Sequence, residues 1–291
     1  MSNPPVMLGM TLPDVDVWSD RVTVALGQNP SAFAGPGTNT YLVGTGPQRL
    51  LIDPGEGRDT YLPILADGMN AAECEGISGI VLTHGHPDHI GGVRSVLEAH
   101  GDLPIWKFPY EPFDEGYDDL AMTPLADGGK VETEGATLRA LHTPGHAPDH
   151  LCFVLEEEGS LFSGDNVLGV GTTVIPSTSG DLGQYMESLD RLLGEAPTAI
   201  YPAHGPKIED GPGKIREYIA HRIAREGQIV AELAKGPRTP MTMVAVIYAA
   251  YPENLHGAAA QSVSQHLMKL EREGRARREG GDAVQAVWTA L

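Results

Sequence analysis

Apolar and polar residues follow two kinds of pattern along the first two hundred positions of the chain. Short apolar runs between glycine and proline predict strands, and apolar residues spaced three to four apart predict helices. The predicted strands are Arg21–Ala25, Thr40–Val43, Arg49–Ile52, Gly79–Leu82, Thr137–Leu141, Leu151–Leu155, Ser160–Phe162 and Ala199–Tyr201. The predicted helices are Tyr61–Asn70, Gly92–Ala99 and Leu182–Leu193. This mixture indicates an α/β or α+β fold built from packed layers.

The remainder of the chain reads as a separate unit. A long helix is predicted over Gly213–Lys235, between Pro212 and Gly236-Pro237, and Thr239-Pro240 after it is expected to be a linker. Three further helices are predicted over Met241–Tyr251, Leu255–Ala260 and Gln261–Glu273, followed by a hairpin of Arg275–Arg278 and Ala283–Trp288. We therefore expect a catalytic domain (residues 1–206), a connecting helix (207–237) and a winged-helix-like C-terminal module (238–291).

The strongest chemical signal is His84-Gly-His86-Pro-Asp88-His89, which follows the apolar run Ile77–Leu82 and precedes Gly91-Gly92. Imidazoles and a carboxylate crowded into one strand-to-helix turn cannot all face a core. They can converge on cations, because both groups are ligands that suit Zn²⁺. The motif therefore predicts a metal site.

The same arrangement recurs three times downstream. His146, Asp165 and His204 each lie just beyond an apolar strand, in a turn shaped by glycine or proline. Strand ends at one edge of a layered domain are where functional sites form. Either histidine alone would as often be structural, but seven such residues in equivalent positions predict one metal centre.

These residues and their surroundings resemble the metallo-β-lactamase superfamily, most closely its β-lactamase-like protein 2 branch of single-strand endoribonucleases. The matching stretches are Gly37-Thr-Asn-Thr-Tyr-Leu-Val, Leu51-Ile-Asp-Pro-Gly-Glu, Thr83–Gly92, Thr143-Pro-Gly-His, Ser163-Gly-Asp-Asn, Tyr201-Pro-Ala-His-Gly-Pro, Tyr251-Pro-Glu-Asn-Leu-His and Leu267–Gly274. The resemblance implies an αββα sandwich with two zinc ions per chain. It assigns His84, His86 and His146 to the first zinc, Asp88, His89 and His204 to the second, and Asp165 to both.

The resemblance also implies hydrolysis by a metal-bridging hydroxide, with Asp88 and Asp165 as the catalytic carboxylates. A bridging carboxylate at Asp165 is typical of ribonucleases and glyoxalase II-like hydrolases and argues against β-lactamase activity. The same machinery serves phosphodiesters, thioesters and lactones. A single-strand endoribonuclease is the first hypothesis and a thioesterase or glyoxalase II-like acyl hydrolase the alternative. A transcriptional or scaffold protein is the third, and the complete ligand set argues against it.

Three residues near the motif are further candidates. Asp53 is expected to orient a ligand histidine, although it could instead cap a turn. Asn39 is a candidate for substrate contact or for an ordinary polar turn. Tyr201 could reach the oxyanion or simply pack in the sheet.

Charge divides the chain. The net charge is −19, with 8 basic and 29 acidic residues over 1–206, against 12 basic and 10 acidic over 207–291. Only the second part could attract a polyanion, so Arg277 and Arg278 are candidate contacts for single-stranded RNA. Their alternatives are to solvate the hairpin or to join a homodimer interface. No apolar run is long enough for a membrane span and no secretory signal is visible, so a cytoplasmic protein is expected.

Overall fold

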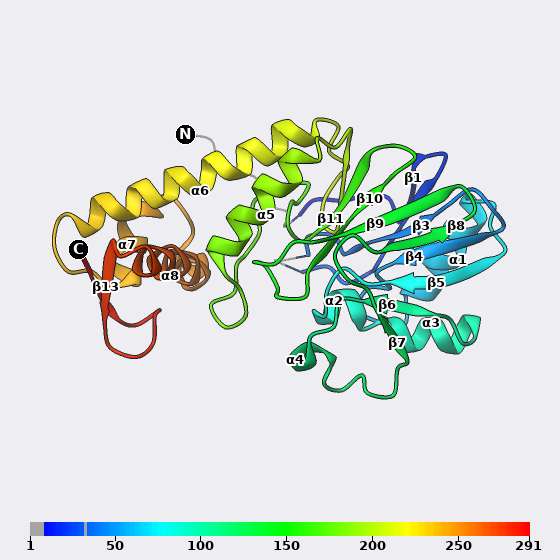
Figure 1. The fold of residues 1–291 in the computed structure, drawn as a ribbon, viewed down its shortest axis with the longest axis horizontal. Coiled ribbons are helices and arrows are strands. Elements are labelled where there is room, and N and C mark those ends of the chain that lie inside the picture. Colours follow the sequence, from blue (N-terminus) through cyan, green and yellow to red (C-terminus); the bar gives the residue numbers. More distant parts are fainter. Residues whose placement is uncertain (1–8, 32–33) are drawn as a thin grey trace.

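The computed structural model describes residues 9–31 and 34–291, and two β-sheets face each other in the larger part of the molecule, at the right of Figure 1. The first sheet holds seven strands in sequence order: β1 (Val15–Ser19), β2 (Val22–Leu26), β3 (Asn39–Val43), β4 (Gln48–Ile52), β5 (Gly76–Val81), β6 (Ile105–Lys107) and β7 (Met122–Pro124). The second sheet has the order β12 (Ile200–Pro202), β11 (Ser160–Gly164), β10 (Leu151–Leu155), β9 (Ala136–His142) and β8 (Lys130–Thr133).

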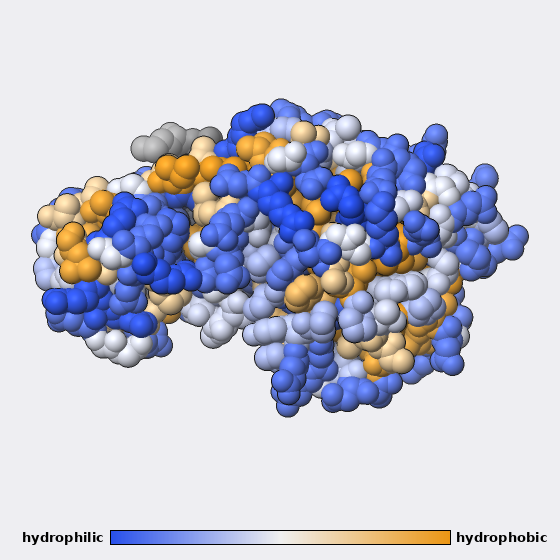
Figure 2. Space-filling view, viewed as in Figure 1, coloured by the Kyte–Doolittle hydropathy of each residue, from blue (hydrophilic) through white to orange (hydrophobic). Residues whose placement is uncertain are grey.

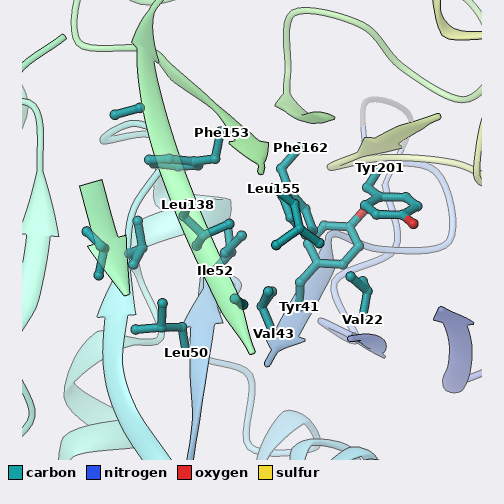
Figure 3. Packing of buried hydrophobic residues seen from close by; sticks show 14 of the residues in the cluster. Val22, Tyr41, Val43, Leu50, Ile52, Leu138, Phe153, Leu155, Phe162 and Tyr201 are labelled. Carbon is teal, nitrogen blue, oxygen red and sulfur yellow. The ribbon is translucent and has the colours of Figure 1, made fainter. Parts of the chain in front are cut away.

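The space between the sheets is filled by one set of alternating strand residues. Tyr41 and Val43 from β3 and Leu50 and Ile52 from β4 meet Phe153 and other apolar residues from the second sheet (Figure 3). Successive side chains of a strand point to opposite faces, so the alternate residues of each strand face outward. Both faces of each sheet therefore need a cover.

Helices supply that cover on the two outer faces. Leu42 and Leu51 of the first sheet pack against α1 (Tyr61–Ala71) and against α3 (Val93–His100), which follows the short α2 (Pro87–Ile90). Cys152 and Leu161 of the second sheet pack against α5 (Leu182–Gly194) and the start of α6 (Gly211–Leu233). The result is an αββα sandwich, which confirms the predicted fold class.

Several elements escaped the sequence pattern because they are short or largely polar. β1 has no buried residue, β8 has a single one, β6 and β7 have three residues each, and α4 (Glu111–Asp114) is a single turn. The four strands that precede candidate ligands (β5, β9, β11 and β12) lie within a few residues of their predicted positions, and so do the long helices.

The C-terminal module contains α7 (Pro240–Ile247), the 3₁₀ turn η1 (Glu253–Leu255), α8 (His256–Arg272) and the hairpin of β13 (Ala276–Glu279) with β14 (Val287–Ala290). It shares α6 with the sandwich: Ile215 and Tyr218 pack under the second sheet, whereas Ile229 and Leu233 join the module's own core. One continuous helix therefore links the two cores (Figure 1).

Three expectations for this module were wrong in detail. Thr239-Pro240 is no linker, since Thr239 caps α7 and Pro240 fills its first turn. The two helices expected over 255–273 are one, because the alanine run 258–260 favours continuation. The second hairpin strand begins at Val287, because Ala286 N–H donates to Asp282 O (2.8 Å) in a preceding turn.

Hydrophilic side chains dominate the face shown in Figure 2, with small hydrophobic patches between them. No helix within residues 9–31 and 34–291 combines the length and the apolar composition needed to cross a bilayer.

Candidate metal centre

The candidate ligands meet at one edge of the sandwich because each follows a strand that ends there. His84, His86, Asp88 and His89 follow β5, His146 follows β9, Asp165 follows β11 and His204 follows β12. The turn before His146 depends on glycine: Gly145 has φ +133°, and a Cβ there would lie 2.4 Å from the Tyr185 backbone. The structure thus gathers all seven predicted ligands.

The first group consists of His84, His86, His146 and Asp165, with donor atoms within 4.8 Å of one another. His86 Nδ1 lies 2.9 Å from His84 Nε2 and 3.0 Å from His146 Nε2. His146 Nε2 lies 3.3 Å from Asp165 Oδ2. Three imidazole nitrogens and one carboxylate oxygen therefore face a common point.

The second group consists of Asp88, His89 and His204. Asp88 Oδ2 lies 3.6 Å from His89 Nε2 and 3.4 Å from His204 Nε2. Asp88 has 30% of its side chain exposed, so it borders the open side of the centre.

Asp165 lies between the two groups. Its Oδ2 faces His146, whereas its Oδ1 lies 3.1 Å from His204 Nε2 and 3.6 Å from His89 Nε2. A carboxylate whose two oxygens face two sets of donors is arranged to bridge two cations.

The outward nitrogens of the ligand histidines are held by the protein. His89 Nδ1 bonds Asp53 Oδ2 (2.8 Å), and His146 Nδ1 bonds the Val174 carbonyl (2.8 Å). His84 Nδ1 lies 3.0 Å from Thr83 Oγ1, whose own proton goes to Asp53 Oδ2. Since these acceptors take the outer N–H groups, the inner nitrogens keep their lone pairs, as metal ligands require.

Among the described residues, His89 Nε2 is a buried atom with no hydrogen-bond partner, and within hydrogen-bond distance Asp165 Oδ1 has only its 3.1 Å contact with His204 Nε2. Buried polar atoms are normally satisfied, and both of these face the second group of ligands. The donor set of five imidazoles and two carboxylates fits divalent transition metals. The residues present therefore fit a pair of cations.

The electrostatics of the two groups differ. Burial, reinforced by His146, lowers the pKa of His86 to about 4, so the first group is neutral apart from Asp165. Around the second group, burial is outweighed by Asp88, Asp53 and Asp165, which raise the pKa of His89 to about 9. Asp165 and Asp88 likewise overcome burial and raise the pKa of His204 to about 10. The carboxylates thus stabilise positive charge at the second group. A divalent cation bound there would displace the extra protons of His89 and His204.

Comparison with known proteins agrees with this geometry. A model of the metallo-β-lactamase superfamily matches residues 34–204, and one of the β-lactamase-associated winged-helix domain matches residues 239–288. The chain belongs to the metallo-β-lactamase superfamily. Membership of this superfamily makes it a metal-dependent hydrolase.

Relatives of this superfamily member match almost end to end. The β-lactamase-like protein 2 homologue of Drosophila melanogaster is 43% identical over 277 residues, covering 91% of this chain and 93% of that one. The lactamase-like protein nscB of Aspergillus fumigatus is 40% identical, covering 97% and 87%. A β-lactamase domain protein from Burkholderia ambifaria has the same fold (TM-score 0.80, 22% identity, 97% and 96% covered).

Asp53 directly follows β4 and supports the second group of this superfamily centre. It is 2% exposed, has φ +53°, and accepts bonds from Thr83 N (2.8 Å), Thr83 Oγ1 (2.7 Å) and His89 Nδ1. This is the geometry expected of a residue that orients a ligand histidine.

Sequence reasoning missed the other supports of the centre. Asp149, fully buried, accepts from Gly85 N (2.8 Å) and pairs with buried Lys107 (2.7 Å), so it holds the turn between His84 and His86. His150 Nε2 accepts from Asp165 N (3.0 Å). The proximity of Asp149 and His150 to His146 in sequence is a weak signal, and Lys107 gives none.

Asn39 and Tyr201 lie away from open solvent. Asn39 is 1% exposed and donates to the carbonyls of Pro202 (2.9 Å) and Gly205 (2.8 Å), so it braces the turn of His204. Tyr201 is 2% exposed, packs in the core between the sheets, and donates to Glu158 (3.2 Å). The structure therefore gives each a packing partner instead of a place at the cleft.

Arg277 and Arg278 are consecutive residues of β13, so their side chains leave opposite faces of the hairpin. Arg277 lies 3.4 Å from Glu279, with 63% of its side chain exposed. Arg278 lies 3.6 Å from Glu271 and over the Trp288 ring. The two candidate RNA contacts therefore lie on different sides of the hairpin.

Proposed function

We propose that this chain is a dizinc hydrolase of the β-lactamase-like protein 2 type that cleaves phosphodiester bonds of single-stranded RNA. The position of Asp165 between two groups of donors supports the dinuclear part of the proposal. The 43% identity to the Drosophila β-lactamase-like protein 2 homologue, over both the sandwich and the C-terminal module, supports the branch.

Zinc is proposed because of the donor set. His84, His86 and His146 offer three imidazole nitrogens, and Asp165 offers a carboxylate oxygen. Such a set of donors is typical of the zinc sites of hydrolases. The second group has two imidazoles and Asp88, and it also receives Asp165. Elemental analysis of protein purified without added metal tests this choice, and iron or manganese in place of zinc would contradict it.

A metal pair supplies Lewis acidity and brings the pKa of a shared water toward neutrality when it is bound. The chain's own groups would then orient the substrate and move protons. Asp88 Oδ2 is partly exposed, accepts from Thr38 Oγ1 (3.5 Å), and has a pKa of about 2, since His89 and His204 outweigh its burial. A carboxylate with so low a pKa stays ionised and is a weak base. It would chiefly orient the attacking group by accepting its hydrogen bond, and it would hold a proton only transiently on the way to the leaving oxygen.

A second candidate, hydrolysis of a thioester or another small acyl substrate, is favoured by the acidity of residues 1–206, which carry 29 acidic against 8 basic residues. Such a surface repels a polyanion but tolerates a neutral substrate. We therefore propose a panel assay of zinc-loaded enzyme with single-stranded RNA, a glutathione or coenzyme A thioester, a lactone and a chromogenic β-lactam.

Salt dependence separates the two candidates in the same assay. Binding to many phosphates weakens steeply as salt rises, whereas a glutathione thioester, which carries a single net negative charge, should respond only weakly. Coenzyme A is itself polyanionic, so its thioester is left out of this comparison. RNA cleavage that falls with salt and exceeds thioester turnover supports the nuclease. Thioester turnover without RNA cleavage replaces it with the acyl hydrolase.

The opposite directions of Arg277 and Arg278 allow a matched test of RNA contact. Arg277 is more exposed, and its ion pair with Glu279 is on the surface and therefore weak. Arg277→Gln should lower affinity for RNA and flatten its salt dependence, whereas Arg278→Gln, on the other face, should change neither. Equal behaviour of the two variants would remove the hairpin from the RNA interface.

A further inference from the structure

Helix α8 of the C-terminal module faces the catalytic sandwich. In winged-helix and helix-turn-helix proteins that read nucleic acid, the recognition helix lies free to enter a groove. Here Val263, Ser264, Gln265, His266 and Leu267 are all buried. α8 also packs directly against α5 of the sandwich. The helix that could read nucleic acid is therefore occupied within the chain.

Gln265 makes the most specific contact of this face. Its side chain is 1% exposed, and its amide Nε2 donates to the carbonyls of Pro176 (2.7 Å) and Gly180 (3.0 Å). Its Oε1 accepts from Leu182 N (3.3 Å). A single buried amide of the module thus holds both ends of segment 176–182, which belongs to the sandwich.

Arg272 contacts the same segment about two helical turns further along α8. Its guanidinium pairs with the carboxylate of Asp181, with Nη2 2.9 Å from Oδ1. Asp181 also caps α5, through Gln184 N, and its own N–H donates to Gly145 O (2.8 Å), beside the ligand His146. The module and the first metal group therefore share this segment.

The other end of the segment reaches the ligands directly. The Val174 carbonyl accepts from His146 Nδ1 (2.8 Å), and Thr173 Oγ1 donates to the carbonyl of Asp165 (2.6 Å). Arg222 of α6, 4% exposed, donates to the Thr173 carbonyl (2.5 Å). Residues 173–182 are thus held by α6 and α8 on one side and hold two candidate ligands on the other.

We propose that Gln265 is a positioning residue through which the C-terminal module sets the orientation of His146 and so the metal affinity of the first group. The inference rests on the proposed metal centre but not on the identity of the substrate. The physical reason is that Val174 can fix the His146 ring only while its own backbone is fixed. Gln265 supplies three of the bonds that fix the adjoining segment.

The test compares Gln265→Met with Ser264→Ala in the full-length chain. Met has nearly the volume of Gln but makes none of its three hydrogen bonds. Ser264, the neighbouring buried residue, bonds the carbonyls of Ala260 (2.8 Å) and Ala283 (3.4 Å), both inside the module. Ser264→Ala therefore weakens the module without touching segment 173–182.

The readout is zinc affinity, measured by competition with a chromophoric chelator, beside thermal unfolding of the metal-free proteins. Loss of a partner that orients a metal-bound histidine weakens metal binding about 10–100-fold. Gln265 acts through one more link, so we expect a loss of about 3–10-fold at one of the two sites. Ser264→Ala should lower the unfolding temperature and leave both affinities unchanged.

Two zinc affinities within 2-fold of wild type in Gln265→Met would overturn the proposal and leave Gln265 a purely structural residue. If Gln265→Met does not fold, Arg272→Met decides, because Arg272 is 53% exposed and holds Asp181 of the same segment. It should weaken the same zinc site, and unchanged affinity there overturns the proposal equally. A wild-type protein that binds no metal would instead refute the metal centre itself.

Discussion

Replacing Asp53 by Asn should disable the second group of ligands while leaving the fold intact. The positive φ of Asp53 is one that Asn adopts readily, and the two side chains have almost the same shape. Asn can still accept from Thr83 N through its Oδ1. Its amide nitrogen, however, must face Thr83 Oγ1 and His89 Nδ1, where the carboxylate accepted two bonds.

The consequence for His89 is a change of tautomer. With an amide N–H opposite it, Nδ1 must accept, so the ring proton moves to Nε2. That nitrogen lies 3.6 Å from both Asp88 Oδ2 and Asp165 Oδ1, at the point where a cation would bind. We expect the affinity of the second site to fall about 10–100-fold, or about 1.4–2.7 kcal/mol.

The assay is a zinc titration followed by elemental analysis after dialysis, which should show one tightly held zinc per chain in place of two. Asp127→Asn is the matched control. Asp127 also accepts a backbone N–H, from His142 (2.8 Å), and pairs with Arg191, but it contacts no ligand. It should lose some stability and keep both metals. Two zinc affinities in Asp53→Asn within about 3-fold of wild type would refute the tautomer argument, since a blocked ligand cannot leave binding unchanged.

Three further outcomes follow from the same geometry. Asp165→Ala should leave less than one metal per chain by elemental analysis, because no carboxylate then separates two dications, and two retained metals would rule out a bridge. Lys107→Met should lower the free energy of unfolding, measured in urea, by about 3–5 kcal/mol, since it leaves the buried Asp149 without its partner. Asp149→Asn in that background should recover part of the loss, and no recovery would show that the charge is not the cause. Cephalosporin hydrolysis should be feeble or absent, and turnover at about 1–10³ s⁻¹ would contradict that expectation.

The pattern of apolar residues predicted most strands and long helices, and the polar residues that follow the strands predicted the set of candidate ligands. Strand and helix periodicity is a local property, and burial in the sandwich follows it closely: β2 to β5 and β9 to β12 lie near their predicted ranges. The ligands could be found because each follows an apolar strand within a few residues. Strands in layered sheets end at a common edge, so a local pattern predicted a long-range cluster.

The contacts between individual atoms became visible only in the folded chain. It showed that the two oxygens of Asp165 face different donor groups, and that Asn39 and Tyr201 are taken up by packing. It also placed Gln265 on a segment more than eighty residues earlier in the chain. No local pattern encodes these contacts, because they depend on how separate elements pack: the two sheets against each other for Asn39 and Tyr201, and α8 against α5 for Gln265. The packing of two elements is stabilised by many weak apolar contacts. The relative position of the two elements is fixed only when both surfaces are formed.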